Sequence, residues 1–156
     1  MTWDNRPPEP AGHAPTADEI DIVLDEIEGL WATWSPTLTN LTLGNGTVLA
    51  KFVQTGSTVH YRFRFTLGTT SAVGTSPQFT LPVAPADYVG PTILGDALLT
   101  DTGTTNRRGY AQQNAGSTCD IIAFSTTGTS AGITATSPHT WASTDVIAVV
   151  GTYEAA

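Results

Sequence analysis

The sequence predicts a mainly β protein, an antiparallel β-sandwich or jelly-roll-like barrel preceded by a Pro-rich extended arm and a short amphipathic helix. Three observations predict this fold class. From residue 34 onward, short alternating segments recur between turns rich in Gly, Ser and Thr, as in small sandwiches and barrels. The chain contains 28 threonines, and this β-branched residue suits a half-exposed pleated surface. Its 156 residues suffice for one domain with a core and a small appendage.

The first part of the chain, residues 1–15, contains four prolines and one glycine. This composition excludes a helix and favours an extended segment. We interpret it as an arm that docks on another protein, with a tail that lies on its own domain as the alternative. The residues expected to make the docking contact are Trp3, Arg6, Pro7, Pro8 and Pro10.

The second part, residues 16–33, begins with a capping box in which Thr16 and Glu19 satisfy each other's backbone amides. Apolar residues then recur at spacings of three and four, which places them on one face of a helix. So short a helix is marginal alone, and its apolar face must be buried on its own β-domain or against copies of itself. Ile20 and Ile27 at heptad position a favour a short coiled-coil stem. The expected oligomer interface consists of Ile20, Val23, Leu24, Ile27, Leu30 and Trp31.

Charge is concentrated in the N-terminal segment. Residues 1–30 hold eight acidic residues and one basic residue, a net charge of −7, whereas the rest of the chain holds six acidic and five basic residues. This distribution repels phosphate groups, so we expect neither nucleic acid nor a membrane as a partner. The sequence lacks the features of a signal peptide, and its single cysteine, Cys119, can form no internal disulfide. We expect a chain that folds in a reducing cytoplasm, with Cys119 as a buried small hydrophobe.

The third part, residues 34–156, is the predicted β-domain. Residues 37–43, 47–55 and 58–67 read as a meander of three antiparallel strands, joined by tight turns that contain glycine. The third of these strands alternates most clearly, which predicts one buried and one exposed face. Its exposed face contains Thr58, His60, Arg62, Arg64 and Thr66, and its buried face contains Val59, Tyr61, Phe63, Phe65 and Leu67.

The remainder of the β-domain is expected to begin with a polar loop at 68–76. Residues 77–83 are apolar but contain two prolines, which favours an edge strand or an extended strap. The further expected strands are 92–100, 108–113, 118–125 and 145–154.

Candidate chemistry is sparse in this sequence. Its three histidines lie far apart and match no metal-ligand spacing, so we expect no metal and no cofactor. Asp96 and Asp101 flank a strand end and could form a carboxylate pair of the kind that glycoside hydrolases use, but Asp101 beside Thr102 and Gly103 is more simply a turn residue. We therefore expect a protein that is not an enzyme.

Two kinds of binding residue are candidates in the β-domain. Arg107 and Arg108 beside Tyr110, or the strand pair Arg62 and Arg64, could bind an acidic partner or the acidic helix of a neighbouring copy, or could simply be solvated. Shallow sugar sites combine an aromatic platform with planar polar side chains. Tyr110 with Gln112, Gln113 and Asn114 provides such a set, and Trp141 beside His139 provides another. The candidate ligand-binding residues are Arg107, Arg108, Tyr110, Gln112 and Trp141.

Three stretches of the β-domain carry a resemblance. Residues 34–47 read W-S-P-T-L-T-N-L-T-L-G-N-G-T, residues 56–65 read G-S-T-V-H-Y-R-F-R-F, and residues 79–82 read F-T-L-P. Over roughly residues 31–125 the chain resembles a β-rich module of virion proteins of tailed phages. In phages of actinobacteria, similar modules end minor tail or fibre proteins or stand alone as capsid surface proteins, typically as trimers. The resemblance implies no catalytic residues.

The resemblance implies a structural protein of the virion surface that folds in the host bacterium. Fibres place the module behind a long shaft, whereas here thirty residues precede it, which favours a homotrimeric capsid decoration protein. In that interpretation residues 1–15 bind the major capsid protein or another virion protein, the helix forms the stem, and the β-domain forms an outward head. The alternative is a tail-fibre or receptor-binding tip that recognises carbohydrate of the host cell wall.

Overall fold

The computed structural model describes residues 31–87, 90–125 and 127–156. The β-domain forms a compact unit from Trp31 to Ala156. The expected arm and the expected helix up to Leu30 lie outside the described residues. The same holds for the contact residues assigned to them: Trp3, Arg6, Pro7, Pro8, Pro10, Ile20, Val23, Leu24, Ile27 and Leu30.

The described residues form ten strands and no helix, and every strand pair is antiparallel. The strands are β1 (Ala32–Thr33), β2 (Leu38–Thr42), β3 (Thr47–Thr55), β4 (Thr58–Thr66), β5 (Ala72–Thr80), β6 (Ile93–Asp101), β7 (Thr105–Gln113), β8 (Thr118–Phe124), β9 (Ser130–Gly132) and β10 (Val146–Glu154). They build one sheet in the order β1-β3-β4-β10-β6-β7-β8-β5-β2, with β9 added to β8. β1 occupies the end of the segment 16–33, so the β-domain begins earlier than residue 34.

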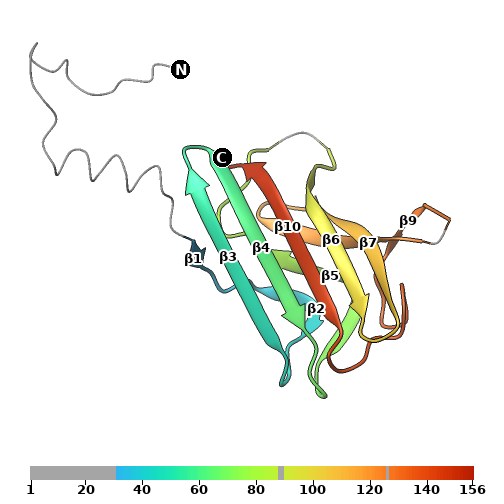
Figure 1. The fold of residues 1–156 in the computed structure, drawn as a ribbon. Helices are drawn as coiled ribbons and strands as arrows, with labels where there is room; N and C mark the ends of the chain where they lie inside the picture. Colours follow the sequence, from blue (N-terminus) through green and yellow to red (C-terminus); the bar gives the residue numbers. More distant parts are fainter. Residues whose placement is uncertain (1–30, 88–89, 126) are drawn as a thin grey trace, which may run out of the picture. The chain divides into compact units, whose positions relative to one another are not determined.

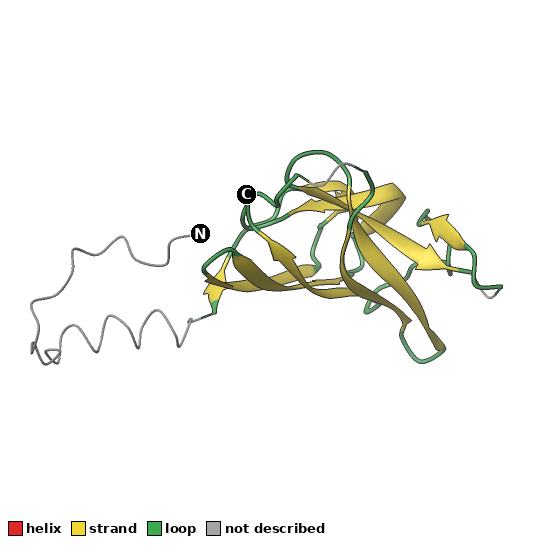
Figure 2. Ribbon diagram, turned by 90° about the horizontal axis from the view of Figure 1, so that it is seen from above, coloured by secondary structure: helices red, strands yellow, loops and turns green. Residues whose placement is uncertain are grey.

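The sheet curls on itself into a half-barrel. β3, β4, β10 and β6 lie side by side in one layer, and β5 and β2 cross behind them (Figure 1). Seen from above, the strands bend round to enclose an interior (Figure 2). The prediction of a mainly antiparallel β fold for the described part is therefore confirmed.

Aromatic side chains of β4 and β5 join the two layers across the core. The rings of Phe63 and Phe79 stack at a centroid distance of 4.4 Å, and Tyr61 contacts both Phe79 and Tyr153. All five residues expected on the inner face of 58–67 are buried, at 4 % exposure or less. Trp34 covers the edge of this core and donates a hydrogen bond from its indole Nε1 to the Thr80 carbonyl at 3.1 Å.

The expected meander of three strands is wrong in one pairing. β3 and β4 form the predicted hairpin, but β2 pairs with β5 in the opposite layer. The Gly44–Asn45–Gly46 turn is present, yet it crosses between layers beside the β4–β5 connection. Asn45 holds that connection, because its side-chain Oδ1 accepts a hydrogen bond from the Thr70 backbone amide at 2.9 Å. The two segments are so close that a Cβ at Gly44 would lie 2.4 Å from the Thr70 carbonyl oxygen. Turn residues alone did not reveal that the chain changes layers there.

The expected loop at 68–76 and edge strand at 77–83 are corrected together. β5 starts at Ala72 because Val73 is buried and pairs with Leu41. β5 is also an interior strand, between β8 and β2. Pro77 is tolerated there because the β2–β5 ladder is irregular at this point, so its missing N–H costs no ladder hydrogen bond.

Candidate interaction surface

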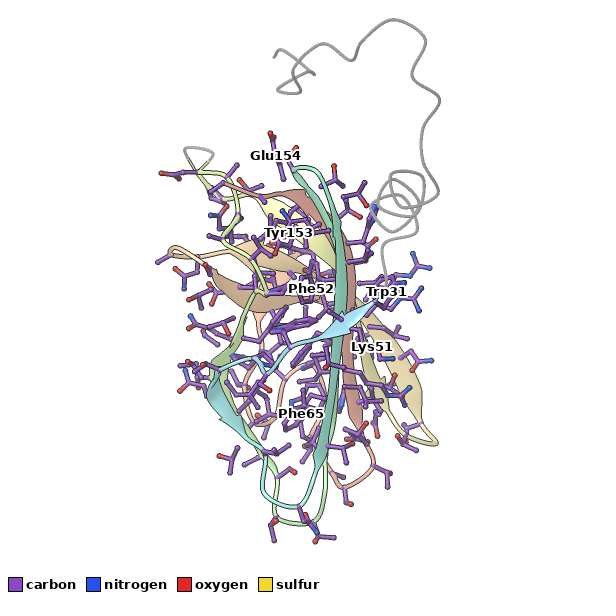
Figure 3. All side chains as sticks on the ribbon, turned by 90° about the vertical axis from the view of Figure 1, so that its left-hand side faces the viewer. Trp31, Lys51, Phe52, Phe65, Tyr153 and Glu154 are labelled. Carbon is purple, nitrogen blue, oxygen red and sulfur yellow. The ribbon has the colours of Figure 1, made fainter. Side chains whose placement is uncertain are left out.

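The side of β3, β4, β10, β6, β7 and β8 that points away from the core carries apolar side chains. We call this side the outer face. Figure 3 shows Phe65 and Tyr153 towards the interior, with Trp31 and Lys51 on the opposite side of β3. The exposed apolar residues of the outer face range from 38 % to 65 % exposure and are Trp31, Leu49, Ile93, Leu98, Phe124 and Val150. A set of this size on one face is typical of an interaction surface rather than of scattered surface residues.

Backbone pairing places these apolar residues in a row with cations. Leu49 lies opposite Arg64, Arg64 opposite Ala148, and Ala148 opposite Leu98. Leu98 in turn lies opposite Arg108 on β7. The row therefore crosses five neighbouring strands and places the apolar side chains of Ala148 and Leu98 between Arg64 and Arg108.

A second row runs parallel to the first. Lys51 lies opposite Arg62, Arg62 opposite Val150, and Val150 opposite Asp96. The Arg62 guanidinium lies over the ring of Trp31, 4.8 Å from the ring centroid, which is cation–π geometry. Four of the five basic residues after residue 30 thus lie on the outer face, and the structure pairs none of them with a carboxylate of the described residues.

The outer face is hollowed along these rows. One hollow of about 610 Å³ is lined by Trp31, Arg62 and Ile93, and a second of about 510 Å³ by Leu98, Arg108 and Phe124. Both hollows include Asp96 and Val150, so they adjoin. We call the joined hollows the outer groove. It has a mostly apolar floor, arginine on both sides and one carboxylate, a composition suited to an acidic partner with an apolar stripe.

A separate, polar hollow of about 460 Å³ lies at the end of β7. It is lined by the side chains of Gln112, Gln113 and Asn114, together with Asp87 and Asp120. Asp120 Oδ1 accepts hydrogen bonds from Gln78 Nε2 at 2.6 Å and from Asn114 Nδ2 at 3.2 Å. The Oε1 atom of Gln113 is buried and has no partner among the described residues. Such planar polar groups can hydrogen-bond hydroxyl groups of a ligand.

The five predicted ligand-binding residues do not form one site. Arg108 and Tyr110 lie on the outer face, where the Tyr110 ring contacts Phe124 at 5.4 Å. Gln112 lines the polar hollow, whereas Arg107 lies on the other side of β7 in a small hollow beside Ser137 and Pro138.

The fifth residue, Trp141, is held in the loop before β10. Its ring lies 4.2 Å from that of His139, and its Nε1 donates to the Thr134 carbonyl at 3.0 Å. It is partly buried and packs against the core rather than standing free as a platform for a sugar ring.

The loop before β10 is held in place by Asp145, which is only 2 % exposed. Asp145 accepts backbone amide hydrogen bonds from Thr102 and Ala142 and lies 3.6 Å from His139 Nε2.

The expected metal-binding and hydrolytic groups were compared with the part of the chain that the structure describes. It contains no cluster of three or more His, Cys, Asp or Glu that could hold a metal ion. Asp96 and Asp101 are five residues apart on β6, about 16 Å along a strand, too far for paired carboxylates. Cys119 is fully buried as expected, and burial raises the pKa of its thiol to about 12.

Comparison of the chain with protein-family models, curated proteins and solved structures gave no match. Among the described residues no helix is long and apolar enough to cross a membrane.

Sequence reasoning identified the arginines of the outer face but missed its apolar residues. Leu98 and Leu99 are adjacent, as are Val149 and Val150, and only one member of each pair faces the core. A run of apolar residues shows no period of two, so it hides which side chain is exposed. The apolar spacing places Trp31 on the expected helix, whereas in the structure its ring lies on the outer face under the Arg62 guanidinium.

Proposed function

We propose that this chain is a non-enzymatic structural protein of a tailed-phage virion. In this proposal it is a homotrimeric capsid decoration or head-surface protein, and its half-barrel, a jelly-roll-like β-domain, is displayed outward. Residues 1–15 attach it to the shell by binding the major capsid protein or another virion protein, and residues 16–33 bring the copies together.

One observation supports an assembly role: the outer face combines exposed apolar side chains with cations that have no carboxylate partner among the described residues. Exposed apolar area of this kind is costly in water and is normally covered by a partner. The β-pattern of residues 34–82 and the distinct composition of the first thirty residues support the virion assignment.

The test is to mix the purified chain with phage particles or empty shells that lack it, and to image them by electron microscopy. We expect trimers at symmetric positions on the shell. Deletion of residues 1–15 should leave the oligomer intact but abolish attachment, because the arm makes the shell contact. Attachment that survives this deletion, or trimers that ignore the shell, would contradict the proposal.

The polar hollow favours a second candidate function, a tail-fibre or receptor-binding tip that recognises host cell-wall carbohydrate. Its amide side chains and Asp120 offer both donors and acceptors to sugar hydroxyls. In this case the chain should bind intact host cells, and Gln112→Ala should weaken binding at least tenfold. The matched control is Gln54→Ala, which removes an exposed amide from the β3–β4 hairpin, outside the lining of the polar hollow. Equal binding by both variants would exclude the polar hollow.

A further inference from the structure

The residues that line the outer groove define the chemistry of a molecule that could bind there. It presents apolar side chains between arginines, so the occupant must have an apolar stripe flanked by carboxylates. The β-domain holds six of the fourteen acidic residues of the chain. Among them Asp145 is buried, Asp87 and Asp120 line the polar hollow, and Asp96 lines the outer groove itself. The other eight acidic residues lie in residues 1–30.

We propose that the outer groove binds residues 16–30 of a neighbouring copy of this chain. The sequence predicts an amphipathic helix for this segment, with Ile20, Leu24 and Ile27 on its apolar face. At 3.6 residues per turn, Asp21 and Glu28 would lie along one edge of that face, and Glu19 and Glu26 along the other. Apolar contact would cover the groove, and these carboxylates would reach the arginines at its sides.

The dimensions of the two surfaces agree. From Leu49 on β3 to Arg108 on β7 the row crosses five strands, about 19 Å at a strand spacing of about 4.8 Å. A helix of fifteen residues is about 22 Å long. One such helix laid across the strands would therefore cover the whole row, with its apolar stripe along Leu49, Ala148 and Leu98 and with Val150 of the next row beside it.

A neighbouring copy is the proposed donor of the segment because this inference rests on the proposed function, which assembles identical copies. A segment that crosses to the next copy covers its groove and joins the two chains in one contact. In this arrangement the crossing segment, and not a central coiled-coil stem, holds the copies together. Arg62 and Arg64 then pair with the acidic residues of that segment.

Charge reversal on the full-length chain tests the contact. Arg62→Glu with Arg64→Glu should lower the mass measured by light scattering from an oligomer to a single chain of 16.3 kDa. Arg62→Lys with Arg64→Lys should keep the oligomer, and so should Arg107→Glu, which lies off the outer face. Circular dichroism and thermal unfolding of each variant will show that the β-domain is folded. An oligomer that survives reversal of both arginines overturns the proposal and favours the stem.

A complementary change should restore assembly. Asp21→Arg with Glu28→Arg should also give single chains, because the segment then repels the groove. One chain carrying all four reversals should assemble again, since attraction is re-established with the signs exchanged. Failure of this rescue in folded protein overturns the charge pairing.

A disulfide test shows whether the contact joins two chains. A tagged Leu98→Cys chain and an untagged Leu24→Cys chain are mixed, refolded together and oxidised. We expect a disulfide-linked pair of different chains, at least fivefold more abundant than with Thr42→Cys in place of Leu98→Cys. Cys119 is buried and should not react. A further chain carries both Leu98→Cys and Leu24→Cys. If its disulfide forms only within single chains, the assignment to a neighbouring copy is overturned. None of these measurements uses phage particles. They can therefore support the contact between copies even if the chain does not bind the phage shell.

Discussion

The inner and outer faces of the same strands differ in how completely they are covered. On β4 the inner residues Tyr61, Phe63 and Phe65 are at most 1 % exposed, whereas Arg62 and Arg64 between them point to solvent. The outer face is nevertheless not a polar surface, because Leu49 and Val150 remain more than half exposed on it. The inner face is therefore buried within one chain, whereas our proposal covers the outer face with a neighbouring copy. The predictions below test that difference, from the largest expected effect to the smallest.

Removing an inner-face ring should give the largest loss of stability. Phe79→Ala leaves a cavity beside Phe63 and Tyr61 at the contact between the layers. We expect the free energy of unfolding to fall by about 3–5 kcal/mol. Urea denaturation followed by tryptophan fluorescence measures this change. Leu49→Ala on the outer face is the control and should cost less than about 0.5 kcal/mol. Similar losses for both variants would show that the two faces are equally buried.

The buried carboxylate that fastens the loop before β10 should give the next largest effect. Asp145→Ala removes the acceptor for the Thr102 and Ala142 amides, at 2.9 Å and 2.8 Å. Leaving buried donors without partners should reduce stability by about 2–3 kcal/mol. Thermal unfolding of this variant beside exposed Asp87→Ala measures the difference. Matching melting temperatures would mean that water replaces the carboxylate without cost.

Alkaline pH should weaken the inner face through Cys119. Burial raises the pKa of its thiol to about 12, above the ordinary value near 9, so the unfolded chain loses this proton first. Its contribution to stability is complete below pH 9 and declines by up to about 1.4 kcal/mol per pH unit towards pH 12. Tyr153, whose pKa burial also raises to about 12, adds in the same direction.

The Cys119→Ala variant isolates the thiol. The stability difference between wild type and this variant should shrink as the pH rises from 8 to 11, because only wild type loses the thiol proton on unfolding. Denaturant titrations at each pH provide the measurement. A constant difference would show that the thiol keeps its ordinary pKa.

The smallest effect is expected from a matched pair of neighbouring valines on β10. Val149 is fully buried, whereas Val150 is 53 % exposed. Val149→Thr buries a hydroxyl and should cost about 1–3 kcal/mol, while Val150→Thr should change the free energy of unfolding by less than about 0.5 kcal/mol. Chemical denaturation of both variants compares the two faces at adjacent positions. A large cost for Val150→Thr in a single chain would show that the outer face is already covered.

Much of the fold was predictable because local signals were strong. The strict alternation of residues 58–67 predicted which side chains of β4 are buried, and Gly56 marked the β3–β4 hairpin. The pairing of β2 with β5 was not predictable, since Gly44–Asn45–Gly46 is equally suited to a hairpin and to a crossing between layers. Of the candidate site, the arginine pair on β4 was found, but its apolar neighbours from β6 and β10 were not.

The sequence by itself determined most strand positions, those of β1, β5 and β9 excepted, together with the buried face of β4 and the separation of an acidic N-terminal segment from a nearly neutral β-domain. These depend on residue spacing and composition, which are local properties. Only the tertiary structure decided that Leu49 and Leu98 share one exposed row with Arg64 and Arg108, and that Val150 and Arg62 lie beside them in the next row. Those residues come from strands far apart in the chain, and neighbouring strands are selected by long-range pairing and core packing. The candidate interaction surface exists only once the sheet is assembled.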